Sequence, residues 1–342
     1  MVSGGVGAKL GLLYKTAESI ELTGRATTVI FDKTGTVTEG APKVCEVVLA
    51  EGFEEEKLLT LAYSVEERSP HPQARAIVEY AKKRVDKLEA EEFENLIGNG
   101  VKARIMQTNV YGGKLEFIKT VASVDEKLER KSEELSRLGM TPIFFAEGDK
   151  CIGIIATMDT PRADSRDAVL RLKEMGLYTV MLTGDNSLVA KAVGEAIGFD
   201  EIISDVLPDG KAKAVEKFRS RGRVIMVGDG INDAPALTSA DVGMAIGGGT
   251  DVAIDSADVV LVKSSLYDVY LAVKLGRRAL KSIHENLFFA FVYNLIGIPL
   301  AAGLFGFALP PMFGAFAMSL SSLSVVSNAL RINSFYTKNK SK

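Results

Sequence analysis

The stretch "TTVIFDKTGTVTEG", from Thr27 to Gly40, decides how the rest of the chain is interpreted. Its apolar and β-branched residues, Thr27–Phe31, predict a buried strand, and Asp32 follows directly. In an open α/β sheet, ligands bind at the carboxyl ends of the strands. Asp32 is therefore either part of a polar turn or a nucleophile placed where a phosphate can reach it.

Further apolar runs along the chain also predict buried strands. Helical patterns such as Ser165–Met175 and Gly210–Arg219 separate several of them. Continuous apolar strands that alternate with helices indicate a parallel sheet covered on both faces. The strand-forming runs are Tyr178–Leu182, Val224–Val227, Val242–Ile246 and Val259–Val262.

Polar clusters follow two of these strands. "VMLTGD" ends in Thr183, Gly184 and Asp185, and "VIMVGDGINDAPAL" contains Asp229 just after its apolar part. Lys211 lies at the start of a predicted helix in "LPDGKAKAV". Each cluster taken singly is typical of a turn, but several of them at strand ends, in this order, favour a phosphate site.

The residue types suit phosphoryl transfer. Asp32 is a carboxylate nucleophile that can form an acyl phosphate. Mg²⁺ prefers hard oxygen ligands and offsets phosphate charge, which suits Asp32 and Asp229. Thr183 and Lys211 can hold phosphoryl oxygens with a hydroxyl and an ammonium.

The stretch from roughly Lys43 to Ala156 differs from the rest because it is rich in Glu and Lys. Two helical patterns, Glu54–Glu66 and Ala74–Glu89, precede the strand candidates "VKARIM" and "NVYGG". We interpret it as an inserted α+β domain over 42–156. The parallel α/β domain then comprises 1–41 and 157–284.

The C-terminal part contains two uncharged stretches. Leu287–Leu309 is long enough to span a bilayer, at about 20 residues or more, and a second stretch continues to Leu330. They predict a transmembrane helical hairpin over 285–331 and a tail over 332–342. A buried soluble helix pair is the alternative. Arg277 precedes the hairpin and Arg331 follows it, so the positive-inside rule places the tail and the preceding domains in the cytoplasm.

Composition excludes some classes of protein. The net charge of -3 gives no general basic bias toward nucleic acid. Cys45 and Cys151 are far apart, which indicates a reducing compartment and no disulfide framework. The first residues lack the apolar run of a cleavable signal peptide.

The motifs "DKTGTVT", "TGD" and "GDGINDAPAL" resemble those of the phosphorylation domain of P-type ATPases, which has the haloacid-dehalogenase-like fold. The resemblance implies that ATP phosphorylates Asp32. Lys33 and Thr34 flank it, with the Thr34 carbonyl as a Mg²⁺ ligand. "MDTPRADS", Met158–Ser165, resembles the hinge to the inserted domain. The same resemblance implies a phosphate and nucleotide site that includes Thr183, Gly184, Asp185, Lys211, Asn232 and Asp233.

Two further segments resemble the nucleotide-binding domain of heavy-metal P-type ATPases. "RSPHPQARAI" is similar to their Ser-Glu-His-Pro motif, and "IGNGV" to their Gly-x-Gly loop. This implies that His71 packs near the adenine of ATP, while Gly98 and Gly100 offer bare backbone to the nucleotide. Pro70 replaces the expected Glu, and "YGGK", Tyr111–Lys114, replaces the usual Gly-Asn. We therefore expect an altered ATP affinity or base selectivity.

The uncharged C-terminal stretches resemble the last two membrane helices of copper(I)-exporting members of this family. The resemblance rests on "YN" and "MSLSS" and implies a transport site of Tyr293, Asn294, Met318 and Ser322. A thioether suits Cu(I), and Ag(I) is the alternative cargo. From the residues alone, the serines could equally help helices pack while Met318 fills a gap.

The resemblance covers almost the whole chain but less than half of such a pump, since the actuator domain and the first six membrane helices are absent. Thr34 stands where hydrolytic relatives carry an aspartate as general acid/base, so we expect slow attack of water on the acyl phosphate. The chain is thus expected to be part of an ATP-driven copper(I) transporter of the cell membrane. Its partners would be the bilayer and a missing N-terminal half or a copper chaperone. The alternatives are a membrane-tethered phosphatase of the haloacid-dehalogenase class or a non-transporting regulatory fragment.

Overall fold

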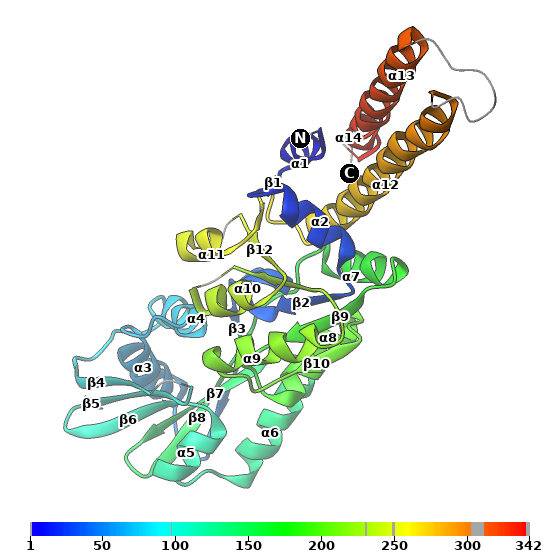
Figure 1. The fold of residues 1–342 in the computed structure, drawn as a ribbon. Coiled ribbons are helices and arrows are strands. Elements are labelled where there is room, and N and C mark those ends of the chain that lie inside the picture. The colour runs from blue at the N-terminus through cyan, green and yellow to red at the C-terminus, as the bar shows by residue number, and fades with distance from the viewer. Residues whose placement is uncertain (1, 97, 230, 248–249, 302–310, 340–342) are drawn as a thin grey trace. The chain divides into compact units, whose positions relative to one another are not determined.

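The structure, a computed structural model, describes residues 2–96, 98–229, 231–247, 250–301 and 311–339 (Figure 1). The chain forms two compact units. Unit 1 comprises Met1–Ile30, Arg171–Tyr178 and Ala212–Lys342, and unit 2 comprises Phe31–Leu170 and Thr179–Lys211. The domain limits predicted from the sequence remain predictions.

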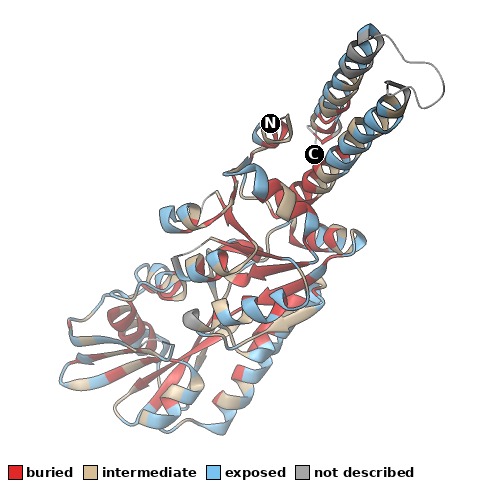
Figure 2. Cartoon of the chain, viewed as in Figure 1, coloured by how far each residue is buried: buried red, intermediate tan, exposed pale blue. Residues whose placement is uncertain are grey.

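Unit 1 is built around three parallel strands, β11 (Val224–Gly228), β12 (Val242–Ile246) and β13 (Val259–Leu261). β1 (Leu12–Tyr14) pairs with β13 in the antiparallel sense. All residues of β11 and β12 are buried, as Figure 2 shows in red. Strands buried on both faces carry continuous apolar runs, which is why the sequence predicted them.

The helices of unit 1 include a close crossing between α2 (Ala17–Arg25) and α12 (Tyr267–Ala301). A Cβ on Gly24 would lie 2.5 Å from the carbonyl carbon of Gly276, so only glycines allow this approach. α13 (Pro311–Leu330) runs beside α12 (Figure 1). The shorter elements are α1 (Val2–Leu10), η2 (Ile231–Asp233), α10 (Ala234–Ser239), α11 (Asp251–Ser256) and α14 (Asn333–Asn339).

α12 and α13 occupy the region in which a transmembrane hairpin over 285–331 was predicted. Among the described residues, no helix combines the length and the apolar character needed to cross a membrane. Residues 302–310, which include the end of the first predicted span, lie outside the described residues. The helix pair is therefore observed, whereas its passage through a bilayer is not shown.

Unit 2 contains the end of β2 (Thr28–Asp32), followed in sheet order by β9 (Tyr178–Leu182) and β10 (Glu201–Ile203). β9 and β10 are parallel. α8 (Ser187–Ile197) lies between them in sequence, and the Asn186 side chain caps it by accepting a bond of 3.0 Å from Val189 N. The remaining elements of this region are η1 (Lys33–Val37), α7 (Ser165–Glu174) and α9 (Pro208–Arg219).

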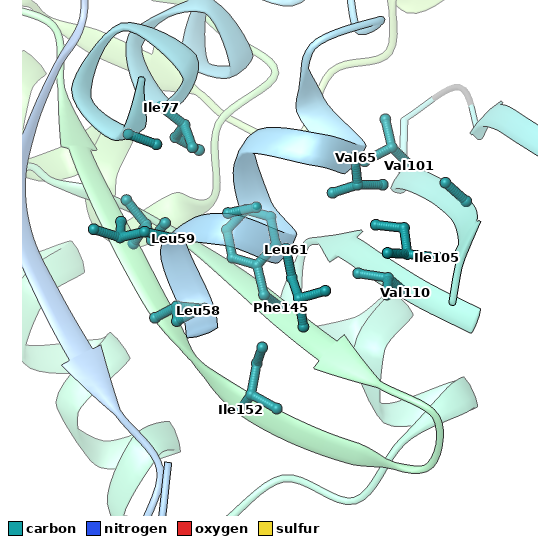
Figure 3. Close-up of a cluster of buried hydrophobic side chains, with 14 of the residues drawn as sticks. Leu58, Leu59, Leu61, Val65, Ile77, Val101, Ile105, Val110, Phe145 and Ile152 are labelled. Atoms are coloured by element: carbon teal, nitrogen blue, oxygen red, sulfur yellow. The ribbon is translucent and has the colours of Figure 1, made fainter. Parts of the chain in front are cut away.

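Unit 2 also holds a six-stranded antiparallel sheet of order β3-β8-β7-β6-β5-β4. Two helices, α3 (Glu55–Glu66) and α4 (Pro72–Ala81), pack on one face around Phe145 (Figure 3). α5 (Leu115–Val121) and α6 (Glu126–Arg137) pack on the other face around Phe144. The strands are β3 (Lys43–Leu49), β4 (Ala90–Leu96), β5 (Gly100–Ile105), β6 (Thr108–Gly113), β7 (Thr141–Glu147) and β8 (Lys150–Met158).

The helix predicted over Ala74–Glu89 is shorter than expected, because α4 ends at Ala81. The chain after it turns toward the sheet. The Ser64 hydroxyl of α3 accepts a bond of 2.8 Å from Leu88 N, and Val85 and Leu88 pack against the core shown in Figure 3. These tertiary contacts outweigh the local helical preference.

Candidate active site

Asp32 is the last residue of β2, and its side chain is buried. Lys211, in the first turn of α9, donates to Asp32 Oδ1 at 2.5 Å. Exposure is 4% for Asp32 and 9% for Lys211, so water screens this pair little. The structure thus joins the proposed nucleophile with a predicted phosphate-binding lysine from a segment 179 residues away.

A second buried ion pair lies beside the first. Lys33 pairs with Asp185, and the side chains of both are largely buried. Thr183, at the end of β9, donates from Oγ1 to Asp185 Oδ2 at 3.3 Å and accepts from Asp185 N at 3.1 Å. The predicted residues at the ends of β2 and β9 therefore form one connected polar group within unit 2.

Arg162 holds the loop that follows Asp32. Its Nη2 donates to Gly35 O at 2.7 Å and its Nε to Thr36 O at 3.0 Å. Gly35 has φ +74°, a conformation that favours glycine. The buried Thr36 hydroxyl has no hydrogen-bond partner within the described part of the chain. The predicted hinge segment Met158–Ser165 thus fixes the backbone of this loop.

Asp159, from the same segment, holds the far end of the loop. Its carboxylate accepts bonds from Thr38 Oγ1 at 2.5 Å and from Gly40 N at 3.1 Å. Burial raises the pKa of Asp159, although the bond from Thr38 and the charge of Lys33 oppose this. Asp159 and Arg162 therefore support the loop, although neither residue was predicted to be catalytic.

Unit 1 carries the remaining predicted carboxylates, on the turn after β11. Asp229 N donates to Asp233 Oδ2 at 3.3 Å, and carboxylate oxygens of the two residues lie within 4.8 Å of each other. Asp233 is buried, Asp229 is half-buried and Asn232 is exposed. Two carboxylates at this separation fit a hard divalent cation such as Mg²⁺.

The predicted nucleotide glycines line a hairpin of bare backbone. Gly100 pairs with Gly113 across β5 and β6, and a Cβ on Gly100 would lie 2.1 Å from Gly112 O. A Cβ on Gly113 would lie 2.4 Å from Asn99 O. Gly98 is exposed with φ +81°. The absence of Cβ atoms at Gly100 and Gly113 lets neighbouring backbone approach closely. Ile97 of the same motif lies outside the described residues.

His71 lies at the start of α4, where its Nδ1 accepts a bond of 3.3 Å from Gln73 N. Partial burial lowers the pKa of His71, and the charges of Lys114 and Lys33 lower it further, while Asp185 acts in the opposite direction. The imidazole is therefore neutral at neutral pH and suited to packing against a base. Pro70, at the position of the family's Glu, is exposed.

Glu66 was not recognised from the sequence as a site residue. Its carboxyl is buried, and burial raises its pKa to about 7 while a hydrogen bond with the Ser69 side chain opposes the rise. A Cβ on Gly112 would lie 3.2 Å from Glu66 Oε1, so the carboxyl reaches the glycine hairpin. Helical periodicity could have found it, because Glu66 lies four residues after Ala62 and seven after Leu59, on the face that α3 buries.

The predicted transport residues are described only in part. Asn294 on α12 is exposed, and its Nδ2 donates to Ala290 O of its own helix at 3.0 Å. Ser322 on α13 is also exposed. The side chains of Tyr293 and Met318 lie outside the described set, so the described side chains do not assemble this site.

The sequence pattern of the haloacid dehalogenase-like hydrolases matches residues 26–241, which contain Asp32, Thr183, Lys211 and Asp229. The chain belongs to the haloacid dehalogenase-like hydrolase family. This membership agrees with the predicted parallel α/β fold.

Curated relatives of this hydrolase-family chain are P-type ATPases. It is 41% identical over 334 residues to a copper-exporting P-type ATPase of Vibrio cholerae, covering 96% of this chain and 36% of the relative. It is 42% identical over 336 residues to a probable copper-exporting P-type ATPase of Archaeoglobus fulgidus, covering 97% of this chain and 41% of the relative. The predicted resemblance to heavy-metal P-type ATPases is confirmed, and the chain spans less than half the length of these relatives.

Solved structures similar to this chain are also P-type ATPases. A zinc-transporting PIB-type ATPase in its E2.Pi state has a TM-score of 0.71 and 35% identity, with 97% of this chain and 54% of that chain covered. The catalytic domain of the CPx-ATPase CopB-B has a TM-score of 0.62 and 30% identity, with 78% of this chain and 95% of that chain covered. Both solved structures are of P-type ATPases, in agreement with the curated relatives.

Proposed function

We propose that the chain is the catalytic part of an ATP-driven metal pump in which Asp32 accepts the γ-phosphoryl group of ATP. The observation that carries the proposal is the buried Asp32–Lys211 pair at the end of β2. Lys211 favours the ionised form of Asp32, and only a carboxylate is nucleophilic. The names of the curated relatives support the class of pump.

The transfer follows from the polar groups of unit 2. One carboxylate oxygen of Asp32 attacks the γ-phosphorus, the bond to the oxygen bridging the β-phosphate breaks, and ADP leaves. Lys211, Lys33 and Thr183 supply donors for the phosphoryl oxygens. Arg162 keeps the loop fixed while the charge is redistributed.

Asp229 would offer a carboxylate oxygen to Mg²⁺, with Asp233 beside it. The closeness of these two carboxylates supports this role. The ion would neutralise phosphate charge during transfer. Asn232, on the same turn, would contact the phosphoryl group.

The nucleotide would lie against the glycine hairpin of Gly98 and Gly100, with its base near His71 and its phosphates near Gly184 and Asp185. The exposed backbone at Gly98, which carries no side chain, supports this placement. Pro70 cannot offer the polar contact of a Glu, so we expect weaker selectivity for adenine.

The cargo that we propose is Cu(I), with Ag(I) as a second soft ion, because the curated relatives are copper transporters. Tyr293, Asn294, Met318 and Ser322 remain the predicted transport residues. We place the chain in the cell membrane with its catalytic units in the cytoplasm, working with the N-terminal half of a pump or receiving copper from a chaperone.

Labelling with ATP carrying ³²P on its γ-phosphate tests the proposal. The wild-type chain and the exposed-site control Asp149→Asn should acquire acid-stable label, whereas Asp32→Asn should acquire at least about a thousandfold less. Equal labelling of Asp32→Asn would overturn the assignment. In a chase with unlabelled ATP the label should persist, because Thr34 supplies no general base. Rapid loss would instead favour a phosphatase.

A further inference from the structure

Lys114 connects two loops of unit 2 that the function requires. It directly follows Gly112 and Gly113, and its backbone N–H donates to Asn99 O at 3.0 Å. Its ammonium donates to Gly184 O at 3.4 Å. The residue is therefore anchored in the glycine hairpin while its charge lies at the Thr183–Asp185 loop.

The charge of Lys114 differs from that of the other two lysines nearby. Lys211 is neutralised by Asp32, and Lys33 is neutralised by Asp185. The Lys114 side chain is exposed and forms no ion pair with any residue that the structure describes. Its bond to the Gly184 carbonyl is long and joins it to a neutral acceptor, so it is easily exchanged for an anion.

The position of this ammonium agrees with the path of a bound nucleotide. Lys114 and Lys33 both influence the titration of His71, so the imidazole and the two ammonium groups lie within electrostatic reach of one another. A nucleotide with its base at His71 and its γ-phosphate at Asp32 must place its phosphates between them. Lys33 and Lys211 each already face a carboxylate, so Lys114 is the one of these three lysines whose charge is available to balance the additional charge of the polyanion.

We propose that Lys114 binds the β- and γ-phosphates of ATP after its ammonium leaves the Gly184 carbonyl. This inference rests on the proposed function and adds a phosphate-binding residue to it. The released carbonyl is on an exposed glycine and can be hydrated. The glycine hairpin, through Lys114, and the Thr183–Asp185 loop would thereby contact the same ligand.

Binding of ATP and AMP to the chain, measured by calorimetry with Mg²⁺ chelated to prevent transfer, tests this role. Lys114→Met should weaken ATP binding about tenfold and leave AMP within about twofold, because AMP lacks the β- and γ-phosphates. Lys114→Arg should restore most of the ATP affinity. Lys127→Met, on an exposed lysine of α6, is the matched control and should bind both nucleotides like the wild type.

The outcomes separate this inference from the function on which it rests. If the wild type binds ATP and Lys114→Met binds it equally well, the role of Lys114 is wrong and the nucleotide site stands. Equal weakening of ATP and AMP would also overturn it, since that result indicates a structural role. If the wild type binds neither nucleotide, both the proposed function and this inference fail.

Discussion

The loop after β2 and the glycine hairpin of β5 and β6 both belong to unit 2, yet they are held in opposite ways. The first contains two buried ion pairs and is fixed by side chains of Arg162 and Asp159. The second is held by the pairing of β5 with β6 and by buried apolar side chains such as Val101 and Val110, and Gly100 lies so close to Gly112 O that no Cβ fits.

The difference agrees with the roles that we propose for the two loops. Phosphoryl transfer needs charges held at fixed positions where little water screens them. Nucleotide binding needs a concave surface that the ligand can approach closely, with few polar groups to set its orientation. The first loop should therefore be sensitive to charge and the second to added volume.

Gly100→Ala tests the volume side and should have the largest effect. The new Cβ would lie 2.1 Å from Gly112 O at φ +156°, so we expect a loss of about 4 kcal/mol in the free energy of unfolding. Gly52→Ala is the control, because Gly52 also has positive φ but nothing lies within 4 Å. It should lose only about 1 kcal/mol in chemical denaturation. Equal losses would show that conformation, not contact, matters at Gly100.

Glu66→Gln tests whether a charge is tolerated beside the glycine hairpin. The pKa of Glu66 rises from 4.5 to about 7 on folding, so its protonated form stabilises the fold. That contribution is fully present below pH 4.5 and is lost as the pH rises through about 7. The shift corresponds to about 3 kcal/mol.

The free energy of unfolding of Glu66→Gln relative to wild type should therefore increase by about 3 kcal/mol between pH 4.5 and pH 8. Glu67→Gln, at its exposed neighbour, should keep the wild-type pH dependence. A flat difference for Glu66→Gln would mean that the carboxyl is solvated in the folded chain.

Arg162→Ala tests the loop that is fixed by side chains. Losing both bonds to the Gly35 and Thr36 carbonyls frees the backbone next to Asp32, so the rate of acid-stable labelling should fall about a hundredfold. Nucleotide affinity should change little, because the glycine hairpin is untouched. Arg166→Ala removes an exposed arginine of α7 and should label normally. A comparable loss in ATP affinity would contradict the separation of the two loops.

His71→Ala should have the smallest effect. Removing the imidazole takes away packing against the base, and we expect about tenfold weaker binding of ATP and AMP alike. The fold should lose less than about 1 kcal/mol, the value of one helix cap. Calorimetry with both nucleotides and a thermal melt measure this. An unchanged dissociation constant would remove His71 from the site.

The sequence by itself determined the parallel strands and the polar residues at their ends. β9 and β12 occupy the predicted residues Tyr178–Leu182 and Val242–Ile246, because a strand that is buried on both faces consists of a continuous run of apolar residues. Asp32 could be identified in the same way, because it directly follows the apolar residues of β2 in the sequence.

Only the tertiary structure decided which distant groups meet. The end of α4 depends on a hydroxyl from α3, the burial of Glu66 depends on the approach of β6, and Lys114 reaches Gly184 across 70 residues of chain. Desolvation and ion pairing are set by neighbours in space, and no local pattern encodes them. The position of Asp32 at a strand end was therefore predictable, while its pairing with Lys211 and the contact of Lys114 with Gly184 were not.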